Sequence, residues 1–146
     1  ASIGQSVVQI TPLQLARAYC VFANGGWLVT PHLADQGLDW TAPSRRSKVP
    51  IKPSTLAKIR EGLRKVVEDG TGYGLNGEGI PPAAGKTGTA EDSTGGPDRA
   101  WFASYAPYPN GEIVVVAFAQ NTPGGGSVHA LPMAKKVIEV WNRNRK

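Results

Sequence analysis

The sequence predicts an α+β fold in which an antiparallel sheet is covered by helices on both faces. Apolar residues recur at helical spacing in three stretches, near residues 12–24, 54–70 and 128–143. Two strand-like segments, 101–106 and 112–120, are joined through a loop that contains Asn110-Gly111, a common turn dipeptide. The run Ile113–Ala119 does not alternate with polar residues, which indicates a strand covered on both faces.

The first helix has clear end signals. Thr11 can cap it, Pro12 suits its first position, and Gly25-Gly26 ends it. Its apolar residues form a wide stripe: Leu15, Ala16, Tyr19, Cys20, Phe22 and Ala23. We therefore expect this helix to be buried on most sides. Residues 26–53 contain several prolines and are predicted to be irregular.

Two further helices follow from the same spacing. The second starts near Ser54 and ends near Gly70, and its predicted buried residues are Leu56, Ile59, Leu63, Val66 and Val67. The last covers roughly 128–143, and its predicted buried residues are Leu131, Ala134, Val137, Ile138 and Trp141. Between them, a glycine-rich stretch from Gly70 to Pro82 leads into a strand that carries Lys86.

Bulk composition excludes some function classes. The net charge of +5 is spread over the chain, and its two basic clusters, 45–48 and 143–146, lack the interleaved aromatic residues of a single-strand binder. We therefore expect no nucleic-acid partner. Cys20 is the only cysteine, so no internal disulfide can form. The sequence contains no apolar run of about 18 residues, so we expect this stretch itself not to cross a membrane.

The segment Lys86-Thr87-Gly88-Thr89 carries the strongest functional signal. In a strand, Lys86 and Gly88 project to one face and Thr87 and Thr89 to the other. Gly88 leaves room for a ligand backbone along the strand edge. The two threonine hydroxyls can hold a substrate carboxylate, Lys86 adds positive potential, and the strand amides can bind an oxyanion.

Other readings of nearby residues are weaker. Gly79 to Gly85-Lys86-Thr87 has five residues between its glycines where a P-loop has four, and Pro81 and Pro82 remove backbone donors. The pattern Gly124-x-Gly126-x-x-His129 lacks the last glycine of a dinucleotide fingerprint, which favours a structural connection.

The histidines and acidic residues predict no functional site that competes with the Lys86–Thr89 segment. His32 and His129 stand apart from each other in the sequence, and we expect no metal site. The acidic residues that flank the triplet, Glu91, Asp92 and Asp98, are predicted to be solvated loop residues.

Several motifs in order resemble one family over almost the whole chain. They are Ile3-Gly4-Gln5, Thr11–Ala16, Ala23–Gly26, Pro31, Ala84–Glu91, Ala100–Phe102 and Tyr105–Pro107. This series resembles the C-terminal part of the transpeptidase domain of class B penicillin-binding proteins, and most of all the elongation-type penicillin-binding protein 2 group. Ser6, where that family usually has glycine, is a mild departure. Residues 1–146 are accordingly expected to be part of one such domain, with a partial penicillin-binding-protein/β-lactamase-like fold.

The resemblance implies roles for the triplet. Lys86 would hydrogen-bond a serine of a second family motif and assist proton transfer. Thr87 and Thr89 would hold the carboxylate of a peptidoglycan stem peptide or of a β-lactam, and the Thr89 amide would contribute to the oxyanion hole. The reaction would be serine acyl transfer from a D-Ala-D-Ala peptide to an acceptor amine. The resemblance implies no cofactor, and it implies a parent protein anchored in the inner membrane with this part on the extracytoplasmic side.

The nucleophile motif of the family is missing from the sequence. No serine is followed by lysine three residues later or by asparagine two residues later. Because loss of the nucleophile costs orders of magnitude in rate, we expect the chain alone to be inactive and to form no covalent penicillin adduct. In the family, the strand at 113–119 pairs with a strand from the part that is missing here, so its free edge is expected to promote self-association.

Two alternatives remain open at this point. One is a fragment of a β-lactamase or penicillin sensor, which deacylation kinetics of the whole protein would distinguish. The other is a non-catalytic module that binds peptidoglycan or a protein partner. A Ser-x-x-Lys motif in the upstream gene would favour an enzyme, and its absence would favour the module.

Overall fold

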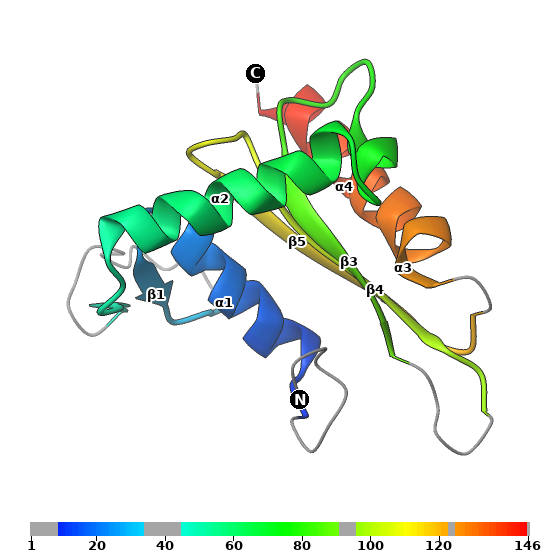
Figure 1. Ribbon diagram of the computed structural model, residues 1–146, viewed down its shortest axis with the longest axis horizontal. Coiled ribbons are helices and arrows are strands. Elements are labelled where there is room, and N and C mark those ends of the chain that lie inside the picture. The colour runs from blue at the N-terminus through cyan, green and yellow to red at the C-terminus, as the bar shows by residue number, and fades with distance from the viewer. Residues whose placement is uncertain (1–8, 34–44, 91–95, 123–124, 146) are drawn as a thin grey trace.

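The computed structural model describes residues 9–33, 45–90, 96–122 and 125–145. Their elements in chain order are α1 (Pro12–Ala23), β1 (Trp27–Val29), β2 (Arg46–Lys48), α2 (Pro53–Glu68), the short 3₁₀ helix η1 (Tyr73–Leu75), β3 (Ala84–Ala90), β4 (Arg99–Ala106), β5 (Ile113–Ala119), α3 (Gly125–Val128) and α4 (Ala130–Asn144). The main sheet is antiparallel with the order β3-β4-β5. Helices lie on both of its faces, which confirms the predicted α+β class (Figure 1).

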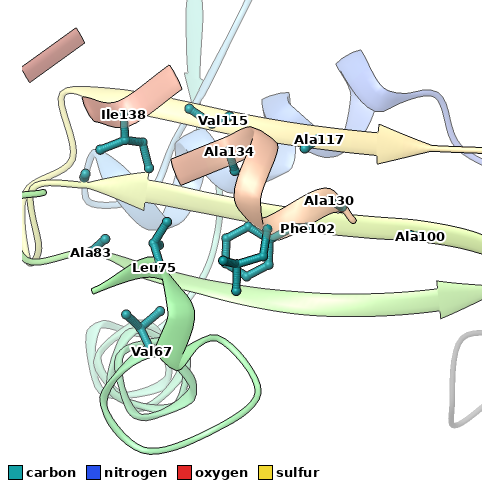
Figure 2. Close-up of a cluster of buried hydrophobic side chains, with 12 residues drawn as sticks. Val67, Leu75, Ala83, Ala100, Phe102, Val115, Ala117, Ala130, Ala134 and Ile138 are labelled. Carbon is teal, nitrogen blue, oxygen red and sulfur yellow. The ribbon is translucent and has the colours of Figure 1, made fainter. Parts of the chain in front are cut away.

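One face of the sheet is covered by α4 through a continuous apolar cluster. Phe102 of β4 is fully buried, and so are Ala134 and Ile138 of α4. Val67 at the end of α2 and Leu75 of η1 complete this cluster, as Figure 2 shows. Fully burying a Val, Leu, Ile or Phe side chain contributes about 1.5–3 kcal/mol. The cluster therefore fixes the α2–η1 connection against the sheet.

The opposite face of the sheet is covered by α1. Tyr19 and Ala23 of α1 pack against Ala103 and Tyr105 of β4. Two arginines of helix α2 hydrogen-bond to α1 and to the residue that precedes β3. The Arg60 Nε atom donates to the Phe22 carbonyl oxygen at 2.6 Å, and Arg64 Nη1 donates to the Ala83 carbonyl oxygen at 2.8 Å.

Most predicted element bounds are confirmed, and α1 shows why its start was predictable. The Thr11 hydroxyl accepts from the Gln14 amide while the Gln14 side chain accepts from the Thr11 amide, which forms a capping box. The prediction that α1 is buried on most sides was wrong. Leu13 is 61% exposed, because the described residues cover the C-terminal half of α1 better than its first turn.

Two other expectations also need correction. Residues 26–53 are not wholly irregular, because β1 and β2 pair as a small antiparallel sheet. Its Trp27 ring lies beneath two cations, with the Arg46 guanidinium carbon 4.4 Å and the Lys48 ammonium 5.0 Å from the ring centre. On α4, Val137 was predicted to be buried but is 48% exposed, because it lies at the margin of the buried face that Leu131, Ala134 and Ile138 form.

Candidate functional site

The predicted site residues lie on β3, at one edge of the main sheet. Within the described residues β3 pairs with β4 alone, so its other edge carries no strand. Lys86, Thr87, Gly88 and Thr89 occupy the middle and far part of this strand. An open strand edge presents backbone amides and carbonyls to a ligand. The segment thus lies on an edge strand of the main sheet among the described residues.

The register confirms the expected alternation of side chains. Lys86 lies opposite Ala103 and Gly88 opposite Trp101. Ala103 packs with the α1 cluster, so Lys86 and Gly88 belong to the α1 face. Thr87 lies opposite Phe102, which belongs to the α4 face. The edge between these two faces is where both sets of side chains can meet one ligand.

The Lys86 side chain folds toward that edge. Its Nζ atom donates to the Thr87 carbonyl oxygen at 2.9 Å and lies 3.4 Å from the Thr87 hydroxyl oxygen. The Lys86 residue is exposed. In an antiparallel strand the N–H and C=O of one residue point the same way and alternate along the chain. A Thr87 carbonyl that meets the Lys86 ammonium therefore indicates that the amides of Thr87 and Thr89 face the open edge.

Thr71 is a residue of this site that the sequence reasoning missed. Its hydroxyl oxygen lies 2.7 Å from the Thr87 hydroxyl oxygen, so the two hydroxyls are hydrogen-bonded. Thr71 follows α2 and comes from a part of the chain 16 residues before Thr87. The available signal was a hydroxyl residue held between two glycines, Gly70-Thr71-Gly72, directly after a predicted helix.

Thr89 reaches a different neighbour, the start of α3. The Gly126 amide donates to the Thr89 hydroxyl at 3.4 Å. Gly126 is buried, and a Cβ atom on it would lie 2.7 Å from the Gly88 carbonyl oxygen. The glycine at this position therefore lets α3 pack directly on the β3 backbone. This supports the structural reading of the Gly124-x-Gly126 pattern, of which Gly124 lies outside the described residues.

The glycines of β3 differ in what surrounds them. A Cβ atom on Gly85 would lie 2.7 Å from the Ala103 carbonyl oxygen and 2.9 Å from the Ser104 Cβ atom, so packing requires glycine there. A Cβ atom on Gly88 would meet only Trp101 Cβ, at 3.4 Å, which is ordinary contact. Packing within the described residues therefore does not explain Gly88, and the space beside it is open to a ligand.

The competing phosphate-binding interpretation fails on geometry. Lys86 and Thr87 lie inside strand β3, whereas the lysine of a P-loop precedes a helix. Among the described residues, no group of three or more His, Cys, Asp or Glu side chains is placed to hold a metal. Of the acidic residues near the triplet, Glu91 and Asp92 lie outside the described part of the chain.

The structure also contains a cavity that lies away from β3. This cavity of about 380 Å³ is bordered by α1, β1 and β5, with Leu13, Cys20, Val29 and Val114 among its walls. Burial raises the pKa of the Cys20 thiol. The cavity is mainly apolar and holds none of the predicted site residues. Of the helices in the described ranges, none has both the length and the hydropathy needed to cross a bilayer.

Comparisons with known proteins agree with one another. The family model of the penicillin binding protein transpeptidase domain matches residues 1–139. The peptidoglycan D,D-transpeptidase MrdA of Haemophilus influenzae is 33% identical over 98% of this chain, and penicillin-binding protein 3 of Bacillus subtilis is 39% identical over 93%. A solved structure of PBP2 from Pseudomonas aeruginosa superposes with a TM-score of 0.76 at 29% identity, over 94% of this chain and 31% of that one.

The matches cover only part of these relatives. The chain spans 25% of the Haemophilus influenzae protein and 21% of the Bacillus subtilis protein.

Proposed function

The chain belongs to the penicillin binding protein transpeptidase domain family, and from this premise we propose that it forms the substrate-side wall of a peptidoglycan D,D-transpeptidase. The wall is the open edge of β3. It binds the C-terminal carboxylate of a stem peptide that ends in D-Ala-D-Ala, and it binds the equivalent carboxylate of β-lactams. The observation that carries this proposal is the Lys86 ammonium held 2.9 Å from the Thr87 carbonyl on that edge.

Each residue of the wall has a distinct task. Lys86 supplies positive charge next to the carboxylate and exchanges protons with a serine of the second family motif. The Thr87 and Thr89 hydroxyls donate to the carboxylate oxygens, since a carboxylate accepts and cannot donate. The outward amide of Thr89 contributes to the oxyanion hole that stabilises the acylation intermediate. Gly88 leaves the face beside them clear.

The reaction in the whole protein is serine acyl transfer followed by transfer to an acceptor amine, which cross-links cell-wall peptides. The serine comes from outside this sequence, which contains no Ser-x-x-Lys. The relatives carry transpeptidase or penicillin-binding-protein names, which favours this reaction over β-lactam hydrolysis. The site lies on the extracytoplasmic side of the inner membrane, where such peptides are found. The outer edge of β5, which has no strand partner in the described residues, mediates self-association of the isolated chain.

Ligand titration of the full chain tests the proposal. N-acetyl-D-alanyl-D-alanine is added to ¹⁵N-labelled protein, and the backbone amide shifts are followed by NMR. The largest changes are expected at Thr87, Gly88 and Thr89. Lys86→Met is expected to weaken binding by roughly tenfold or more, because it removes one charge-assisted hydrogen bond while keeping the side-chain length.

Lys136→Met is the matched control. Lys136 is an exposed lysine of α4 paired with Glu139 at 3.1 Å, so this variant loses the same charge far from β3. It is expected to bind as the unmodified chain does. If both substitutions weakened ligand binding equally, Lys86 would act only through the net charge of the chain and not through a contact with the carboxylate. Shift changes that cluster away from β3 would refute the proposed site.

A further inference from the structure

The contact between two threonine hydroxyls has a consequence for ligand selection. Thr71 Oγ1 and Thr87 Oγ1 are 2.7 Å apart, and either atom can be the donor. We propose that Thr71 is a positioning residue that donates to Thr87 and thereby turns the only hydroxyl hydrogen of Thr87 toward the ligand carboxylate. This inference rests on the proposed function, in which Thr87 contacts that carboxylate.

The turn that carries Thr71 is held firmly in place. The Gly72 amide donates to the Val66 carbonyl oxygen at 2.9 Å, which folds the chain back over the end of α2. A Cβ atom on Gly70 would lie 2.9 Å from the same carbonyl oxygen, so packing requires glycine there, and a Cβ atom on Gly72 would be in tight contact with it at 3.0 Å. Leu75, four residues later, is fully buried. Thr71 is itself exposed, so its hydroxyl is fixed by its backbone and by Thr87.

The number of donors and acceptors at Thr87 determines which direction of this hydrogen bond leaves a hydrogen for the ligand. A hydroxyl group has one hydrogen and two lone pairs. The Lys86 ammonium, 3.4 Å away, can only donate, so it occupies one lone pair of the Thr87 oxygen. When Thr71 donates to the other lone pair, the Thr87 hydrogen has no acceptor among these partners and points to the open edge. If Thr71 accepted instead, Thr87 would have no hydrogen left for a ligand.

In this arrangement the Thr87 hydroxyl can donate a hydrogen bond to a ligand but cannot accept one. A carboxylate presents an acceptor oxygen in either of its two orientations. A terminal amide presents one carbonyl oxygen, which can accept from Thr87, and one NH₂ group, whose hydrogens find no free lone pair on Thr87, so only one of its two orientations matches. Without the Thr71 hydroxyl, the Thr87 hydroxyl can rotate and accept from an amide ligand. Thr71 therefore contributes to the preference for a free carboxylate over a neutral terminus.

The test compares two ligands on three variants of the full chain. The ligands are N-acetyl-D-alanyl-D-alanine and its C-terminal amide, and the variants are Thr71→Val, Thr71→Ser and Thr87→Val. Dissociation constants are measured by NMR titration. For Thr71→Val we expect carboxylate binding to weaken about fivefold, the factor for one hydrogen bond of roughly 1 kcal/mol. Amide binding should change less, so the ratio of the two affinities falls.

Thr71→Ser keeps the hydroxyl and is expected to keep the ratio of the unmodified chain. An unchanged ratio in Thr71→Val, or an equal loss in the valine and serine variants, would overturn the inference, because the hydroxyl would then not set the preference. Thr87→Val separates this from the proposed function. If it leaves carboxylate binding intact, the proposed site is wrong. If it abolishes binding while Thr71→Val leaves the affinities for both ligands unchanged, the Thr71 inference alone is wrong.

Discussion

Two glycines of β3 allow folding and ligand binding to be separated in one experiment. Gly85→Ala places a methyl group 2.7 Å from the Ala103 carbonyl oxygen and 2.9 Å from the Ser104 Cβ atom. Both atoms belong to β4 and cannot move aside without distorting the sheet. Overpacking of this kind costs about 1–3 kcal/mol, so the free energy of unfolding should fall by that amount.

Gly88→Ala should behave in the opposite way. Its methyl group would meet Trp101 Cβ at 3.4 Å, an ordinary contact, and the backbone there is not in the left-handed region. A compatible Gly-to-Ala change reduces the entropy of the unfolded chain, so the free energy of unfolding should stay within about 1 kcal/mol of the original value. The same methyl group stands where the proposed ligand lies, so we expect binding of N-acetyl-D-alanyl-D-alanine to weaken roughly tenfold, a loss near 1.4 kcal/mol.

Urea unfolding followed by tryptophan fluorescence gives the stabilities, and NMR titration gives the affinities. The two variants share the strand and the chemical change, so each serves as the control for the other. A folded Gly88→Ala chain that binds with unchanged affinity would refute the role of the open face. A Gly85→Ala chain of unchanged stability would refute the packing argument.

Three further predictions concern the chain as a whole. A fluorescent penicillin should leave no stable covalent label, because no Ser-x-x-Lys is present; a band that survives denaturing electrophoresis would contradict this. Light scattering should detect self-association through the free edge of β5, and a monodisperse monomer would count against it. Burial raises the pKa of Tyr19 and of Tyr105 to about 12, above the value of 10.0 for a free phenol. Their contribution to stability is therefore complete below pH 10 and falls between about pH 10 and 12, by roughly 1.4 kcal/mol per pH unit and tyrosine. Urea titrations should show a smaller decline in Tyr19→Phe.

Much of the fold followed from local signals. The start of α1 could be predicted because Thr11 and Pro12 define it through contacts with residues close by in the sequence. The β4–β5 hairpin could be predicted because its turn and its apolar run are each a short contiguous stretch of sequence. The site strand was placed by the triplet, and the alternation of Lys86 and Thr87 follows from strand geometry alone.

What the sequence did not reveal depends on contacts between distant residues. β1 and β2 have three residues each, too few for a periodic pattern, and their pairing joins Trp27 to Lys48 across the chain. Val137 lies at helical spacing from Ala134, but spacing alone does not say which side of an apolar stripe the sheet will cover. The Thr71–Thr87 contact was missed for the same reason, since it exists only after the turn behind α2 packs beside β3.

The central claim is that the open edge of β3 recognises a carboxylate, and one comparison of ligands tests it most directly. Benzylpenicillin and its methyl ester are titrated separately into the ¹⁵N-labelled chain, since they differ only in the free carboxylate. Saturable shift changes at Thr87, Gly88 and Thr89 with the acid, and much weaker ones with the ester, are the predicted result. Equal changes with both ligands, or changes centred on the cavity beside Cys20, would contradict the claim.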